Sequence, residues 1–146
     1  MKDDPLMSLV HATYSFQAML NQQLNESHLN DLLQPGMGPI LFALEENEGC
    51  SVKTLAERTQ RSTPTLSNTL KRMKAKGLIQ TKPDKEDKRA VCISMTAKSK
   101  KLLPRLHAMH ENMLNIALSK VKTKKFKLLK EQLGQMSEAM RESTQS

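Results

Sequence analysis

The sequence predicts a mainly helical protein that carries one small β-hairpin. Its 146 residues suffice for one ordinary domain, so we expect a single domain over residues 1–146. Hydrophobic residues make up 38% of the chain and aromatic residues 3%, which suits helices because a helix needs only an apolar stripe. Apolar residues recur at helical spacing through most of the chain, and the pattern changes to that of strands only near residues 78–95.

The first expected helix covers residues 5 to about 30. One face of this amphipathic helix recurs every three or four residues, and its members are Leu6, Val10, Thr13, Phe16, Leu20 and Leu24. Pro-Gly and Gly-Pro pairs then mark a turn or loop within residues 35–39. A second helix is expected over residues 40–48, because its apolar run stops at Gly49.

Two further helices are expected in quick succession. Ser51 is a good N-cap for a short helix, and a tight turn is expected at residues 59–61. Ser62 caps the next helix, which runs to Lys76 before Gly77 ends it. This order predicts a helix-turn-helix.

Strand-like spacing follows the second of these helices. Residues 78–82 and 90–95 alternate as strands do, and they flank a charged loop over residues 83–89. We therefore expect a β-hairpin, the wing of a winged helix-turn-helix lobe over residues 51–95. Thr96 caps a fifth helix, in which Pro104 could introduce a kink.

The last third of the chain repeats apolar residues in heptad fashion. The repeating positions are Leu102, Leu106, Met109, Met113 and Ile116, followed by Phe126, Leu129, Leu133, Met136 and Met140. Each seam is too short for a free-standing coiled coil. The helices could form a hairpin within one chain or a bundle between two chains, joined by the first helix. We favour the second arrangement because one chain lacks the apolar mass to cover all three stripes.

The expected quaternary structure is therefore a homodimer built from N- and C-terminal helices. The dimerisation segments are residues 5–34 and 97–142. The side chains expected in the interface are Leu6, Val10, Leu106, Met113, Phe126, Leu129, Leu133 and Met136.

The second helix of the lobe has the chemistry of a DNA-reading helix. Leu66, Leu70 and Met73 share its inward face. The outward face has no acid and no large apolar group, and it holds Pro64, Asn68, Lys71 and Ala75, flanked by Thr65, Ser67 and Arg72. Short hydroxyls and amides reach base edges in the major groove, while lysine and arginine bind guanine or phosphate.

Charge is distributed unevenly along the chain. The net charge is +8, yet residues 1–50 hold one basic and seven acidic residues, whereas residues 51–101 hold fourteen basic and four acidic ones. A basic middle is expected of a polyanion-binding site. A solvated basic face is the alternative, and charge alone favours nucleic acid only modestly.

The chain resembles the MarR family of bacterial transcriptional regulators over nearly its whole length. The most specific match is the segment from Asp84 to Val91 and on to Thr96, which resembles the wing signature of the family. The Ser51–Glu57 segment and the Thr65–Ile79 segment resemble the two helices of its recognition unit. Gln80 and Ser99 stand where the family often has Arg and Gly.

This resemblance implies an obligate homodimer that binds a pseudo-palindromic operator with two recognition helices and two wings. It implies that Arg89 reaches into the minor groove and that Asp87 positions the wing. The residues expected to contact double-stranded DNA are Ser62, Thr63, Thr65, Ser67, Asn68, Lys71 and Arg72 on the helix and Asp87, Lys88 and Arg89 on the wing.

The family usually senses a small ligand between its dimer helices and its DNA-binding lobe. The candidate lining residues are His11, Tyr14, Phe16 and Met37, although each is also ordinary core material. The sequence does not identify the effector.

Other chemistries have weaker support. No phosphate loop, zinc-protease motif or nucleophile elbow is present, so no catalytic residue, cofactor or metal is expected. His107 and His110 have helical spacing for a metal, but exposed helix histidines are common. Cys50 and Cys92 could sense oxidants, and a helix N-terminus could lower the pKa of Cys50. The family's peroxide sensors place their reactive cysteine in the first helix, where this chain has none.

The functional expectation is a cytoplasmic, operator-binding transcriptional regulator, most simply a repressor released by a small ligand. Two cysteines cannot form a disulfide framework, and no apolar segment is long enough to span a membrane. The alternative is a nonspecific or architectural DNA-binding protein. A membrane-surface role for the lysine-rich residues 120–130 is a third class, which would require binding to anionic lipid.

Overall fold

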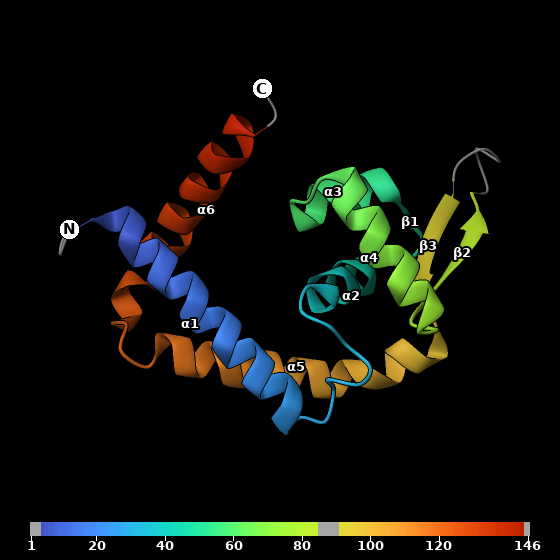
Figure 1. Cartoon of the computed structure of the whole chain (residues 1–146), viewed down its shortest axis with the longest axis horizontal. Helices are drawn as coiled ribbons and strands as arrows, with labels where there is room; N and C mark the ends of the chain where they lie inside the picture. Colours follow the sequence, from blue (N-terminus) through green and yellow to red (C-terminus); the bar gives the residue numbers. More distant parts are fainter. Residues whose placement is uncertain (1–3, 85–90, 145–146) are drawn as a thin grey trace. The chain divides into compact units, whose positions relative to one another are not determined.

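The structure is a computed structural model that describes residues 4–84 and 91–144. The chain divides into two compact units, Met1–His110 and Glu111–Ser146. Figure 1 shows the elements of both. The predicted fold class is confirmed: helices dominate, and one small sheet lies in the first unit.

Helix α1 runs from Pro5 to Glu26, and so ends before the predicted residue 30. The end is caused by a residue in the left-handed region, His28 at φ 50°. The Leu29 N–H donates to the Leu24 carbonyl at 2.9 Å, and both side chains are buried. This is a Schellman arrangement with its usual hydrophobic contact, formed here around a histidine rather than a glycine.

Helix α2 runs from Met37 to Glu46, so it begins three residues earlier than predicted. Gly36 precedes it at φ 92°, a conformation that side-chain-bearing residues rarely adopt. Pro39 is accommodated because it lies in the first turn, where no backbone donor is needed.

The predicted helix-turn-helix is confirmed by α3, Val52–Thr59, and α4, Thr63–Ala75. The Ser51 hydroxyl accepts the Thr54 N–H at 3.1 Å, as an N-cap should. Gly77 ends α4 at φ 69°. The N–H groups of Gly77 and the next residue close a second Schellman arrangement.

The sheet has three antiparallel strands in the order β1-β3-β2. Strands β2, Ile79–Pro83, and β3, Val91–Met95, form the predicted hairpin. Strand β1, Cys50–Ser51, was not predicted, because two residues are too short for an alternating pattern. It pairs with β3 and ties the start of α3 to the wing.

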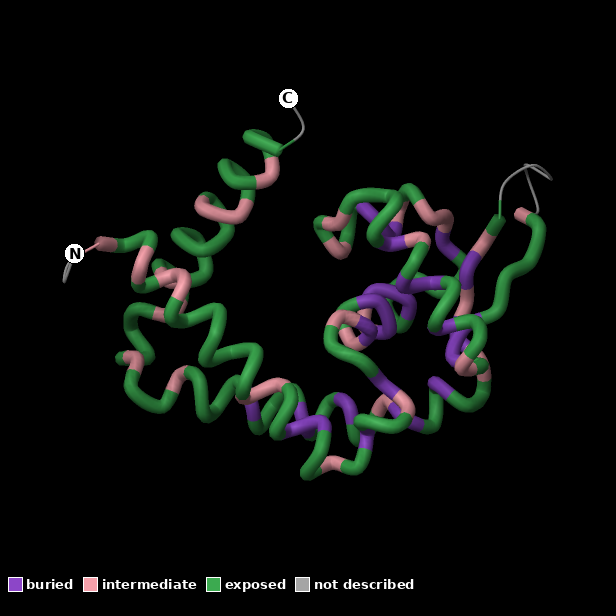
Figure 2. Tube along the Cα trace, in the orientation of Figure 1, coloured by how far each residue is buried: buried purple, intermediate pink, exposed green. Residues whose placement is uncertain are grey.

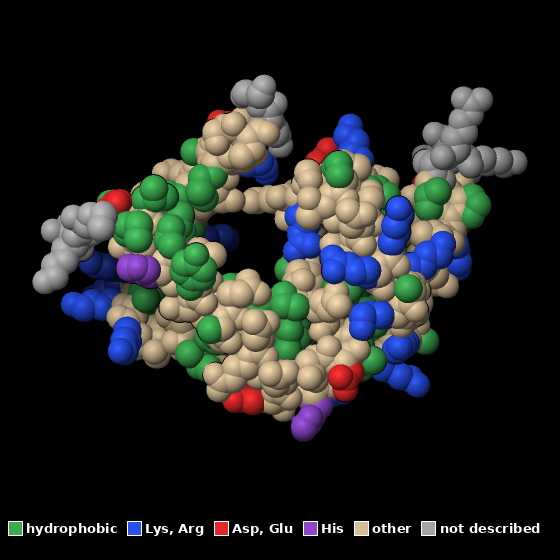
Figure 3. All heavy atoms as spheres, viewed as in Figure 1, with side chains coloured by type: hydrophobic (Ala, Val, Ile, Leu, Met, Phe, Trp, Pro, Cys, Tyr) green, Lys and Arg blue, Asp and Glu red, His purple; other side chains and the backbone are tan. Residues whose placement is uncertain are grey.

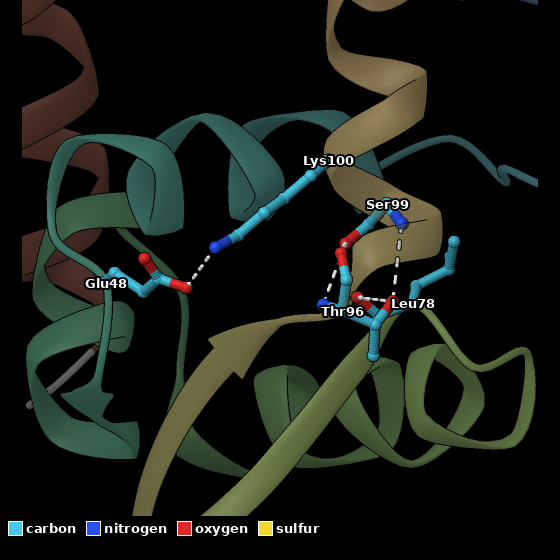
Figure 4. Close-up of polar contacts among 5 residues, drawn as sticks. All are labelled: Glu48, Leu78, Thr96, Ser99 and Lys100. Carbon is cyan, nitrogen blue, oxygen red and sulfur yellow. Dashed lines mark hydrogen bonds and ion pairs between the residues drawn. The ribbon is translucent and has the colours of Figure 1, made fainter.

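Helix α5 runs from Ala97 to Leu118, with Pro104 inside it. Its start is a reciprocal cap: the Ser99 N–H donates to the Thr96 hydroxyl at 3.3 Å, and the Thr96 N–H donates to the Ser99 hydroxyl at 3.1 Å (Figure 4). Lys100 pairs with Glu48 at 2.7 Å in the same view. Ser99 therefore has a defined structural use at a position where the family often has glycine.

The second unit contains the last turns of α5, the 3₁₀ turn η1 (Thr123–Lys125) and α6 (Phe126–Ser143). Helix α6 contains no buried residue. None of the helices in the described ranges carries an apolar stretch long enough to span a bilayer.

The core of the first unit lies between α2, α3, α4 and the sheet, where Figure 2 shows the buried positions gathering. Its fully buried side chains come from all of these elements, and they include Leu41, Leu44, Leu55, Leu66, Met73, Leu78 and Ile93. This shared core holds α4 in a fixed position relative to the wing strands.

Candidate nucleic-acid interface

Helix α4 presents one buried face and one exposed face. Leu66, Leu70 and Met73 are buried, as the helical wheel predicts. Asn68 and Lys71, on the opposite side, are exposed. Because the buried face is fixed by the core, the exposed face is a rigid surface that carries short polar and basic side chains.

The predicted contact residues of this helix all lie on that surface or beside it. Ser67 is half-buried, and the exposed ones are Ser62, Thr63, Thr65, Asn68, Lys71 and Arg72. The Ser62 hydroxyl caps α4 by accepting the Thr65 N–H at 3.4 Å, and it donates to the Thr65 hydroxyl at 2.9 Å. The first turn is therefore ordered before any ligand arrives.

Basic side chains gather over α4 and the adjoining strands (Figure 3). Two acids of this unit pair with cations outside α4: Glu46 pairs with Arg58 at 3.3 Å, and Glu48 pairs with Lys100. Among the described residues, no acid forms an ion pair with Lys71 or with the other cations of α4. The positive charge of this surface is therefore available to a polyanion.

Two cations of α4 are tied to neighbouring segments. The Lys74 ammonium donates to the Thr81 hydroxyl of β2 at 2.9 Å, which links the helix to the wing strand. The Arg72 guanidinium donates to the side-chain oxygen of Gln34 at 3.1 Å. Sequence reasoning missed Gln34, because 38 residues separate the two partners and no local pattern connects them.

The wing residues Asp87, Lys88 and Arg89 lie outside the described residues. Strands β2 and β3, which precede and follow this segment in the sequence, are described and pair with each other (Figure 1). Their predicted contacts with DNA stay a prediction.

The two thiols lie on opposite faces of the sheet. Cys50 pairs with Ile93 and Ser51 with Cys92, and successive side chains in a strand alternate between faces. Burial raises the pKa of the Cys50 thiol, contrary to the lowering that a helix N-terminus could produce. Cys92 donates to the Asp84 carboxylate at 2.8 Å, and this hydrogen bond raises its pKa. Neither environment activates a thiolate.

The candidate ligand-pocket residues lie in different surroundings. His11, Tyr14 and Phe16 are exposed on α1, with Tyr14 72% exposed. Met37 is fully buried at the start of α2. Met37 thus belongs to the core of the chain, whereas the three α1 side chains are open to a ligand or to another protein.

The histidine pair of α5 packs on α2. The His107 ring nitrogen lies 2.8 Å from the Glu45 carboxylate. The Phe42 ring lies 5.0 Å from the ring of His107 and 5.4 Å from that of His110. No group of three potential metal ligands occurs within the ranges that the structure describes. These contacts give both histidines a packing partner.

The predicted dimerisation residues divide into two sets by burial. Leu106 and Met113 are already buried, and Leu106 reaches to 3.6 Å from the place where a Cβ on Gly38 would stand. The exposed or half-exposed set is Leu6, Val10, Phe126, Leu129, Leu133 and Met136. This second set forms apolar stripes on α1 and α6 that the chain leaves open to solvent.

Comparison with known proteins finds similarity in the segment that holds the recognition helix. Residues 38–90 match the model of the MarR family. The organic hydroperoxide resistance transcriptional regulator of Bacillus subtilis is 43% identical over 56 residues, which are 38% of this chain and 38% of that regulator. The similarity to this relative therefore covers less than half of its length.

Solved structures match over a longer span. BpsR of Bordetella bronchiseptica has a TM-score of 0.84 at 20% identity, over 94% of this chain and 95% of that one. MepR of Staphylococcus aureus, solved with DNA, has a TM-score of 0.80 at 21% identity, over 93% of this chain and 98% of that one. At such low identity, these likenesses establish the fold.

Proposed function

We propose that this chain is a member of the MarR family, whose model matches residues 38–90, and that it is a sequence-specific DNA-binding transcriptional regulator. It binds a pseudo-palindromic operator as a homodimer and acts as a repressor that a small ligand releases. The related structures support this proposal: MepR is solved as a DNA complex, and the DNA binding of BpsR is regulated by 6-hydroxynicotinic acid.

The exposed face of α4 is the observation that carries the proposal. It combines an amide, hydroxyls and cations on a helix whose opposite face is anchored in the core. An α-helix fits the major groove, and side chains of these kinds discriminate base edges there. Asp87, Lys88 and Arg89, which stand between β2 and β3 in the sequence, are proposed to supply a second contact to the DNA.

The exposed apolar stripes of α1 and α6 support the homodimer. Leu6 on α1 is 61% exposed and Leu133 on α6 is 49% exposed, and each belongs to a helical stripe of apolar residues, which a partner chain would cover. A two-fold dimer presents two copies of α4, and it therefore predicts two operator half-sites separated by one helical turn of about 10 base pairs or by a multiple of it.

The effector binds next to the dimer helices and acts by preferring the DNA-incompetent state. The coupling of such a ligand to DNA binding is typically about 1–3 kcal/mol. The exposed α1 residues His11, Tyr14 and Phe16 are the first candidates for contact with it.

Competition footprinting on the promoter region of the chain's own gene tests the proposal. A regulator should protect one discrete palindrome in the presence of excess random DNA. Uniform protection that random DNA removes would instead support the alternative, a nonspecific or architectural DNA-binding protein. Release of the protected site by aromatic acids, added one at a time, tests the effector.

A further inference from the structure

The loop between α1 and α2, residues 27–36, is fastened to the helix-turn-helix. The Lys76 ammonium, at the end of α4, donates to the carbonyl of Asp31 at 2.9 Å. The Arg61 guanidinium, in the turn between α3 and α4, lies against Gly36. A Cβ added at that glycine would stand 2.8 Å from its Nη2 atom. The loop is therefore held at both its middle and its end.

Gln34 has a fixed backbone within this loop. The Met37 N–H donates to the Gln34 carbonyl at 3.0 Å, and the Gln34 N–H points to the Met37 sulfur at 3.5 Å. Met37 is fully buried, so this turn is anchored in the core. The side chain of Gln34 extends from the anchored turn to the Arg72 guanidinium of α4 at 3.1 Å.

The acceptor suits an arginine that must keep its charge. A guanidinium carries five donors in a rigid fork, and Gln34 engages one of its nitrogens, Nη1. The neutral amide restricts the motion of the arginine but leaves its charge intact. A carboxylate at the same place would cancel that charge.

We propose that Gln34 is a positioning residue for DNA binding, which holds Arg72 so that its remaining donors face a DNA phosphate beside the recognition helix. This inference rests on the proposed function. An arginine that is already ordered loses less conformational entropy when it binds. Loss of the restraint should therefore weaken binding by about two- to tenfold per half-site, the range expected for one side chain of this kind.

A double-mutant cycle on operator DNA tests the proposal. Gln34→Ala and Gln34→Met should each weaken binding by the stated factor, because both remove the acceptor and the second keeps the length of the side chain. In an Arg72→Ala background, either change should have no further effect. Asn30→Ala is the matched control, because Asn30 is an exposed amide of the same loop, and it should bind as the unchanged chain does.

The salt dependence of binding separates positioning from charge. Arg72→Ala and Gln34→Glu should each reduce the salt slope by about one ion per subunit, whereas Gln34→Ala should leave the slope unchanged. Equal losses from Gln34→Ala with and without Arg72 would overturn the inference, as would an Arg72→Ala variant that binds normally. Absence of operator preference in the unchanged chain would instead refute the proposed function itself.

Discussion

Leu66 and Asn68 are two residues apart on α4, and truncating each to alanine should separate folding from recognition. Leu66 is fully buried, and removing such a side chain from a core lowers the free energy of unfolding by about 2–5 kcal/mol. Asn68 is exposed, so Asn68→Ala should change that free energy by less than about 1 kcal/mol. A bidentate amide–adenine contact contributes about 1–3 kcal/mol of discrimination between bases. Asn68→Ala should therefore weaken binding to the operator by that amount and change binding to random DNA little.

Two assays on the same samples check this prediction. Urea unfolding followed by helical circular dichroism gives the stability of each variant, and fluorescence anisotropy gives affinity for operator and for random DNA. After correction for the folded fraction, Leu66→Ala should bind both DNAs as the unchanged chain does. The reasoning is refuted if Asn68→Ala unfolds the protein, or if it weakens both DNAs equally.

Three further predictions follow from the wing, the apolar stripes and the thiols. Arg89→Ala should weaken operator and random DNA evenly and lower the salt slope by about one ion per wing, measured by anisotropy across a salt series. Unchanged affinity for random DNA would argue against that role. The double substitution Leu133→Asp and Met136→Asp should produce aggregated or unfolded chains, whereas the unchanged chain should have the mass of a dimer by light scattering. A folded monomer that binds operator normally would contradict the proposed dimer. The raised pKa values of Cys50 and Cys92 keep both thiols protonated at neutral pH, so native alkylation should be slower than in the unfolded chain and should accelerate only as pH rises past the usual thiol range. The double substitution Cys50→Ser and Cys92→Ser should leave any effect of oxidants on DNA binding unchanged.

Much of the fold could be predicted because its signals are local. Ser51 and Ser62 were recognisable as helix N-caps from the few residues that follow them. In the structure, each hydroxyl accepts a backbone N–H from the first turn of its helix. The inward face of α4 was equally clear, since Leu66 and Met73 share one side of a regular helix. These features need only the geometry of one element.

Features that depend on distant parts of the chain could not be predicted. Strand β1 exists because Cys50 and Ser51 pair with β3, more than 40 residues later. The Gln34–Arg72 contact joins the loop between α1 and α2 to helix α4, 38 residues further along the chain. The end of α1 at Glu26 depends on a histidine in the left-handed region, a conformation for which sequence patterns favour glycine.

Selection of binding sites from random DNA tests the central claim most directly. The 146-residue chain is incubated with a pool of random duplexes, bound DNA is amplified, and the enriched sequences are read. A dimeric regulator that reads DNA with α4 predicts one pseudo-palindromic motif, with half-site centres separated by one helical turn of about 10 base pairs or by a multiple of it. Asn68→Ala should relax one position in each half-site. Recovery of DNA with no enriched motif, at any number of rounds, would contradict sequence-specific recognition by this helix.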